Sequence, residues 1–166
     1  MSFSNRIPSG VTLCLTEKRI NMILLAIPQR DYFMQYLSYF KQLHVKDLIV
    51  AAEPDPNLDF FEANHINVHN IQSEDGAAPS QKIIDLFWSL FASPKRGHND
   101  FIAVACKRGY GVSPALAAIA LISKGYSPEE ALEQMRKYNP HFITERQRRF
   151  LLTYQPIKEK NECRIS

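Results

Sequence analysis

Residues 106–113, Cys-Lys-Arg-Gly-Tyr-Gly-Val-Ser, have the types and spacing that could carry out chemistry. A short apolar segment, residues 101–105, precedes them, and a segment rich in Ala, Leu and Ile follows and ends near Gly125. A strand that leads through a glycine-containing loop into a helix directs backbone N–H groups and the positive helix end toward one point. We therefore expect an anion-binding loop, with Cys106 at its mouth as a candidate nucleophile.

This spacing resembles that of the cysteine-dependent protein tyrosine and dual-specificity phosphatases, whose signature is His-Cys, five residues, then Arg-Ser/Thr. Cys106, Gly109 and Ser113 stand where that pattern requires them. Ala105 stands at the histidine position, and Val112 stands at the arginine position, six residues after the cysteine. The resemblance implies a phosphate-binding loop that lacks its arginine and is made of Lys107, Arg108, Gly109, Tyr110, Gly111, Val112 and Ser113.

The composition limits the other possibilities. A chain of 166 residues with 45% hydrophobic residues can bury one core, so we expect one domain over residues 1–156 and a short tail, residues 157–166. The net charge of +3 gives no reason to expect a nucleic-acid partner. Three widely separated cysteines predict a reducing compartment, with neither a disulfide framework nor a metal site. No cofactor is expected, and no apolar run is long enough to span a membrane.

The elements that must position the loop follow an alternating order. Apolar segments predict strands at residues 21–27, 47–52, 66–71 and 101–105. Apolar residues at helical spacing predict helices at residues 32–43, 58–63 and Gln81–Phe91, after the loop, and at Pro128–Tyr138 and residues 144–154. We expect Asp31, Ser127 and Thr144 to cap three of these helices. This order predicts an α/β fold with a central, mostly parallel sheet and helices on both faces.

With this order established, residues 4–156 resemble the phosphatases of regenerating liver, a prenylated family within the same superfamily. The stretches that carry the resemblance are DGAAPSQKIID, SPALAAIALISKGYSPEEAL and QRRFLLTYQP. The resemblance implies the cysteine-phosphatase fold. It also implies that Cys106 is the nucleophile, that Asp75 is the general acid and that Glu53 lies beside the site. Gln147 matches a family glutamine to which the spacing assigns no role.

The sequence departs from this family at several positions. Ala52 stands where the family has a second cysteine, so a regulatory disulfide with Cys106 is not expected. Ile71-Gln72 replaces the Trp-Pro of the acid loop, and Ser113 replaces an alanine. Val112 matters most, because only a guanidinium offers a phosphoryl group two parallel donors and a permanent charge. We therefore predict a strongly impaired enzyme that acts by binding.

Two other functions stay open. The chain could be a weak phosphatase that uses Cys106 on phosphotyrosine or another phosphomonoester. It could also bind phosphoinositides through Lys107 and Arg108, although we expect these side chains to point outward from the loop. The expected protein partner is a phosphoprotein or an acidic loop, such as that of a cyclin-M-type magnesium transport mediator. In the family that contact uses the arginine too, so Val112 weakens this expectation.

The chain ends in Cys163-Arg164-Ile165-Ser166, which fits a prenylation motif, and a terminal serine favours farnesyl. Members of the family end in the same way. We expect the chain at the cytoplasmic face of the plasma membrane or of endosomes if Cys163 is prenylated, and otherwise in the cytoplasm. One lipid binds reversibly, so basic residues near the tail would have to support it.

Overall fold

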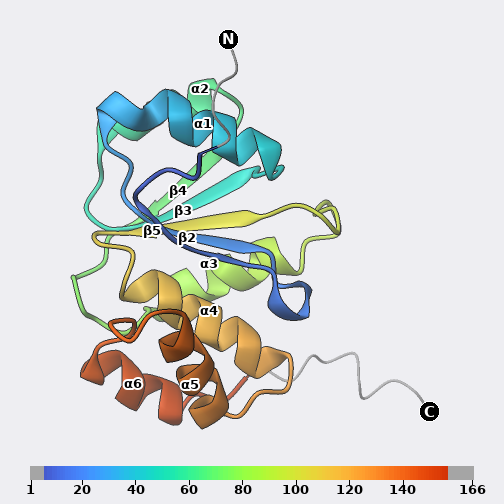
Figure 1. Cartoon of the computed structure of the whole chain (residues 1–166), viewed down its shortest axis with the longest axis vertical. Helices are drawn as coiled ribbons and strands as arrows, with labels where there is room; N and C mark the ends of the chain where they lie inside the picture. The colour runs from blue at the N-terminus through green and yellow to red at the C-terminus, as the bar shows by residue number, and fades with distance from the viewer. Residues whose placement is uncertain (1–5, 157–166) are drawn as a thin grey trace.

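The computed structural model describes residues 6–156, so Cys163 and the rest of the predicted tail lie outside the described residues. Five strands form one sheet in the order β1-β2-β5-β3-β4 (Figure 1). β1 is antiparallel to β2, and the other neighbours are parallel. The sheet is therefore mostly parallel, as the sequence predicted. The strands are β1 (Val11–Leu15), β2 (Met22–Ala26), β3 (Asp47–Ala51), β4 (Asn67–Ile71) and β5 (Ile102–Cys106).

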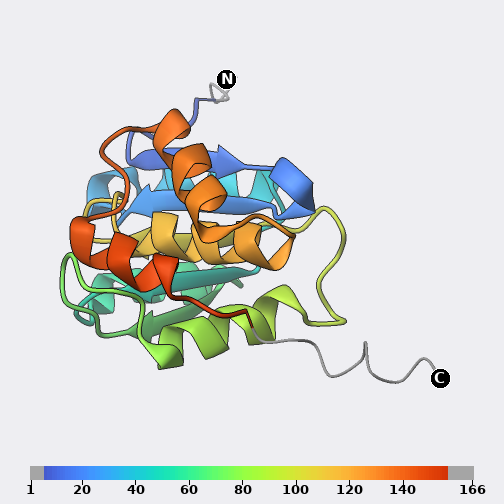
Figure 2. The same ribbon diagram turned by 90° about the horizontal axis from the view of Figure 1, so that it is seen from below.

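Helices cover both faces of the sheet (Figures 1 and 2). One face carries α1 (Phe33–Gln42) and α2 (Asp59–Ala63). The other carries α3 (Gln81–Phe91), α4 (Val112–Ser123), α5 (Pro128–Tyr138) and α6 (Glu145–Leu152). Among residues 6–156, no helix combines the length and hydropathy that a membrane crossing requires.

The strands form two cores because successive side chains point to opposite faces. On β2, Ile23 and Leu25 pack toward α1 and α2, whereas Met22 and Leu24 pack toward α3 and α4. Strands that are buried on both faces are expected to be apolar along their whole length. β5, with the sequence Ile-Ala-Val-Ala-Cys, is buried at every position and fits this expectation. α4 is also buried along nearly its entire length.

Two predictions about local structure were wrong. The sequence analysis missed β1, an edge strand that is only partly buried at four of its five positions, so its sequence shows no continuous apolar run. Asp31 does not cap α1, because the chain first forms a short 3-10 turn (Arg30–Tyr32) and α1 begins at Phe33. Asp31 therefore lies inside that turn rather than before the free N–H groups of the helix.

The predicted caps of the last two helices are confirmed. The Ser127 side chain accepts a hydrogen bond from the backbone of Glu130, and Thr144 forms a reciprocal capping box with Gln147. The parallel register places Cys106 level with Ala26 of β2 and with Ala51 of β3. The carboxyl ends of the three central strands therefore meet at one edge of the sheet, where α/β proteins bind their ligands.

Candidate functional site

Cys106 is the last residue of β5, one residue later than the predicted end of that strand. It is buried, and its sulfur lies 3.2 Å from the hydroxyl oxygen of Ser113. Ser113 is the second residue of α4, so the helix begins inside the segment that the sequence assigned to the loop. The strand end and the first turn of the helix are thereby joined directly beneath the loop.

Gly109 fixes the path of the loop between Cys106 and α4. Its φ of +76° is in the region that favours glycine, and a Cβ there would lie 2.8 Å from the backbone nitrogen of Ala26. The hydroxyl of Thr12, on β1, donates a hydrogen bond of 2.8 Å to the Gly109 carbonyl. The sequence analysis did not identify Thr12, because its part in the site depends on the strand that was missed.

Val112 is the first residue of α4 and is only 3% exposed. It lines the same cavity as Cys106, so its side chain forms part of the wall of the site. An isopropyl group offers neither a hydrogen-bond donor nor a charge to an anion at this position. The N-cap residue of the helix, Gly111, has no side chain, so no side-chain group occupies the first backbone N–H groups of α4 from that position.

A cavity of about 510 Å³ opens above Cys106 and brings most of the predicted site residues together. Its wall includes Cys106, Lys107 and Val112 from the loop and helix, and Glu53 and Asp75 from two other segments. Ala52, at the position of the family's second cysteine, also lines the cavity. The predicted nucleophile and general acid therefore share one cavity, as their assumed roles require.

The two basic residues after Cys106 make different contacts. Lys107 is exposed and lines the cavity, so it does not simply point away from it. The Arg108 side chain is 71% exposed, but its Nη2 atom lies 3.5 Å from Oδ2 of Asp75, whose side chain is 47% exposed. Arg108 therefore reaches across to the acid loop. No pattern along the sequence indicates this contact, because 33 positions separate the residues and only the folded loops bring them together.

Gln147 acquires a role that its sequence position did not reveal. Its buried side chain accepts a hydrogen bond from the Thr144 backbone at 2.8 Å and donates one to the Ala77 carbonyl at 2.9 Å. The Thr144 hydroxyl donates to the Gly76 carbonyl at 3.1 Å. The first turn of α6 therefore holds the segment that follows Asp75.

Tyr110 lies at the outer side of the loop rather than in the cavity wall. Its side chain is exposed, its ring centroid lies 5.9 Å from that of Phe142, and its carbonyl accepts a hydrogen bond from the Ile143 backbone. The cavity itself carries the carboxylates of Glu53, Asp55, Glu74 and Asp75 together with the ammonium of Lys107. Among residues 6–156, no three His, Cys, Asp or Glu side chains are grouped to hold a metal ion.

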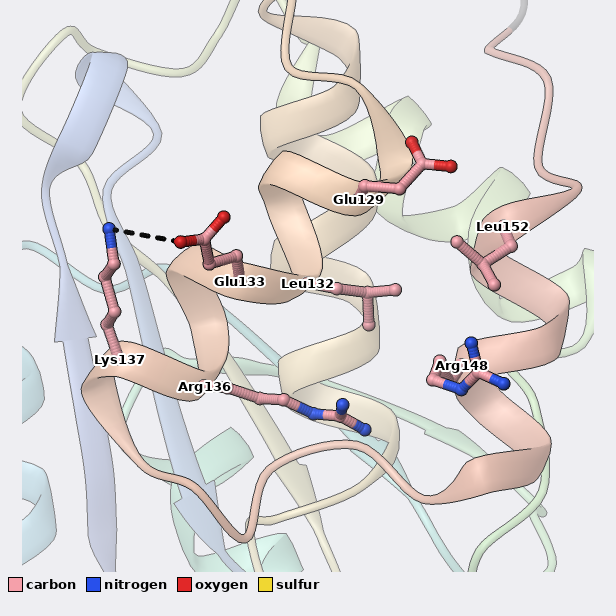
Figure 3. A pocket seen from close by; sticks show the side chains of 7 residues that line it. All are labelled: Glu129, Leu132, Glu133, Arg136, Lys137, Arg148 and Leu152. Carbon is pink, nitrogen blue, oxygen red and sulfur yellow. Dashed lines mark ion pairs between the residues drawn. The ribbon is translucent and has the colours of Figure 1, made fainter.

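A second hollow of about 510 Å³ lies between α5 and α6 (Figure 3). Leu132 and Leu152 provide its apolar lining, and the ion pair between Glu133 and Lys137 lies at one side. Its wall includes no residue of the loop or of the acid segment. This hollow is therefore separate from the site at Cys106.

Comparisons with known proteins agree with this geometry. No family model matches the chain. The chain is 32% identical over 148 residues to the PRL-1 phosphatase of Drosophila melanogaster, covering 87% of this chain and 84% of that protein. It is 33% identical over 145 residues to the protein tyrosine phosphatase type IVA 3 of Mus musculus, covering 86% and 83%.

Among solved structures, a protein tyrosine phosphatase from Leishmania major matches with a TM-score of 0.70. The match covers 82% of this chain and 88% of that chain at 23% identity, which establishes the cysteine-phosphatase fold. The sequence relatives establish more than the fold, because they share nearly the whole domain. The chain belongs to the PRL family, the type IVA protein tyrosine phosphatases.

Proposed function

We propose that this protein is a PRL-type phosphatase homologue in which hydrolysis is strongly impaired and which acts by binding. One observation carries the proposal: Val112 lies buried in the cavity of Cys106, at the position where the family signature has arginine. The backbone N–H groups of the loop and the N-terminus of α4 still favour an anion. The replacement of arginine by valine should therefore weaken anion binding less than it weakens turnover.

The expected loss of rate follows from the chemistry of phosphoryl transfer. Catalysis depends on positioning and on neutralising the charge of the equatorial oxygens. If the missing guanidinium contributes as much as an arginine finger does, the rate falls by about 10³- to 10⁵-fold. Neither cation near the loop replaces it directly: Arg108 contacts Asp75, and Lys107 offers a point charge without the fork of a guanidinium.

The test is the turnover of a generic aryl phosphate by the wild type, Cys106→Ser, Val112→Arg and Val112→Met. We expect negligible turnover by the wild type and by Cys106→Ser. Val112→Arg should gain turnover that depends on Cys106, whereas Val112→Met, which adds length without charge, should not. Turnover by the wild type that disappears in Cys106→Ser would contradict the proposal.

A weak phosphatase is the second candidate, and one observation favours it. The Ser113 hydroxyl lies 3.2 Å from the Cys106 sulfur, and Asp75 shares the cavity, so a nucleophile, a sulfur hydrogen-bond partner and an acid are all present. In this case the wild type would show slow turnover that Asp75→Asn and Cys106→Ser both abolish. The same assay therefore separates the two candidates.

Membrane attachment and the partner belong to the proposal too. We propose that a prenyl group on Cys163 tethers the protein, and that a phosphorylated or acidic segment of a partner protein approaches the backbone N–H groups of the loop. Cys163→Ser should move the protein from the membrane fraction to the soluble fraction of cells. Cys14→Ser, which alters a cysteine of β1, is the matched control and should leave the distribution unchanged.

A further inference from the structure

A groove of about 590 Å³ runs along the outer side of α1, away from the site at Cys106. Leu37 and Tyr39, which are almost fully buried, contribute to its wall, together with Tyr32 and Met34. Arg6, the first described residue of the chain, also lines the groove. The groove is therefore built by α1, by the 3-10 turn that precedes it and by Arg6.

The groove exposes large apolar side chains. The exposed fraction is 68% for Met34 and 50% for Tyr32. Ile7, which follows Arg6 but does not line the groove, is 59% exposed. Within residues 6–156 only two other large apolar side chains are comparably exposed, Tyr110 and Tyr138, and neither lines this groove. An apolar surface gathered in one place indicates a contact that residues 6–156 do not themselves complete.

The path of the chain leads to this groove. The Gly10 backbone is hydrogen-bonded to the hydroxyl of Tyr36, on α1. Pro8 is buried, and Arg6 then reaches the groove wall. The described structure therefore begins, at Arg6, in the wall of the groove, and the sequence before it is Met-Ser-Phe-Ser-Asn.

We propose that this groove holds the chain's own residues 1–5, with Phe3 as the apolar anchor. Three residue steps separate Phe3 from Arg6, a reach of about 10 Å in an extended chain. In an extended segment Met1 and Phe3 share one face, and Ser2 and Ser4 share the other. The segment thus offers an apolar face to the apolar side chains of the groove, whose wall also contains polar residues such as Gln35 and Ser38. Its covalent link gives it a high effective concentration there.

The oxidation of methionine to its sulfoxide provides the test, because the methionines of this chain lie in different parts of the structure. Met22 and Met135 are fully buried and serve as internal references, whereas Met34 lies in the groove. The full-length protein is exposed to dilute hydrogen peroxide, and sulfoxide formation at each methionine is followed by mass spectrometry. The variants are Phe3→Ala, Phe3→Leu, which keeps an apolar side chain, and Ser4→Ala, on the opposite face of the segment.

If the segment is docked for two-thirds of the time, Phe3→Ala should raise the rate of Met34 oxidation by roughly threefold. Phe3→Leu should raise it less, and Ser4→Ala should leave it unchanged. Equal rates of Met34 oxidation in the wild type and in Phe3→Ala would overturn the proposal. Protection of Met34 from oxidation that persists in Phe3→Ala and increases with protein concentration would also overturn the proposal. That result would assign the groove to a second copy of the chain.

Discussion

The Cys106 sulfur and the Ser113 hydroxyl lie 3.2 Å apart, across a loop whose two ends they join. Both side chains are buried, so the contact is shielded from water. A hydroxyl at this distance can donate a hydrogen bond to sulfur when sulfur carries negative charge. Sulfur carries that charge before it attacks a phosphoryl group and again when a phosphocysteine is hydrolysed.

Removing this hydroxyl should therefore slow the chemistry without unfolding the protein. In the Val112→Arg background, we expect Ser113→Ala to lower the turnover of an aryl phosphate by about tenfold, the equivalent of one hydrogen bond of about 1.4 kcal/mol. Thermal unfolding of both variants checks that the fold is retained. Equal turnover with and without the hydroxyl would show that the contact is only structural.

Gly109→Ala should destabilise the protein more than Gly125→Ala. Both glycines have positive φ, +76° and +107°, so both substitutions impose backbone strain of about 1–2 kcal/mol. A Cβ at Gly109 would also lie 2.8 Å from the Ala26 nitrogen and from the Thr12 methyl group, whereas nothing lies within 4 Å at Gly125. We expect Gly109→Ala to cost an additional 1–3 kcal/mol or so. Urea unfolding measures the difference, and equal losses would contradict it.

Gln147→Ala should loosen the acid loop. The substitution removes a capping contact and the hydrogen bond to Ala77, and it leaves buried groups without partners, at a cost of about 1–3 kcal/mol. Amide hydrogen exchange should become faster at residues 74–78. Arg146→Gln is the control, because its 3.7 Å ion pair with Glu74 is exposed and contributes little. Faster exchange in the control alone would contradict this role for Gln147.

Glu17 should make the stability of the fold depend on pH. The hydroxyl of Tyr126, followed by Tyr138 and Gln134, donates hydrogen bonds that lower the Glu17 pKa from its ordinary value of 4.5. A lowered pKa in the folded state stabilises the fold above the unfolded pKa, and this stabilisation is lost as the pH falls through the folded pKa. Glu17→Gln should therefore lower the free energy of unfolding by about 1–2 kcal/mol at pH 7.

The difference between wild type and Glu17→Gln should narrow as the pH falls below 4.5. Urea unfolding at several pH values measures it. Glu133→Gln provides the control: the Glu133 side chain is 71% exposed and is paired with Lys137 at 3.8 Å, so this variant should match the wild type throughout. A difference in the free energy of unfolding between wild type and Glu17→Gln that stays constant with pH would show that ionisation of Glu17 is not its cause.

The sequence predicted the parts of the fold that local chemistry determines. Apolar runs predicted four strands to within one residue at each end, because strands buried on both faces need continuous hydrophobicity. Ser127 and Thr144 predicted helix starts because a cap acts within one turn. β1 was missed because apolar and polar residues alternate only weakly along this edge strand. The 3-10 turn before α1 moved the start of the helix beyond Asp31.

The candidate site also combines features that the sequence predicted with contacts that it did not predict. Cys106 and its loop were visible because one continuous segment contains them, and the resemblance located Asp75. Contacts between distant segments were not visible. The Arg108–Asp75 ion pair, the support of Gly109 by Thr12 and the hold of Gln147 on Ala77 each join residues at least 33 positions apart. Spacing along the chain provides no signal for such pairs, since only the folded sheet and its loops bring them together.

The placement of α6 has a consequence for where this protein can act. Its first turn touches the acid loop, its eight residues span about 12 Å, and the described chain ends four residues later, at Pro156. The seven residues from 157 to Cys163 extend over at most about 25 Å. If a lipid holds Cys163, the first turn of α6 stays within roughly 50 Å of the bilayer, since residues 153–156 add at most about 14 Å. Such an arrangement would confine the protein to ligands displayed in the thin layer next to the membrane.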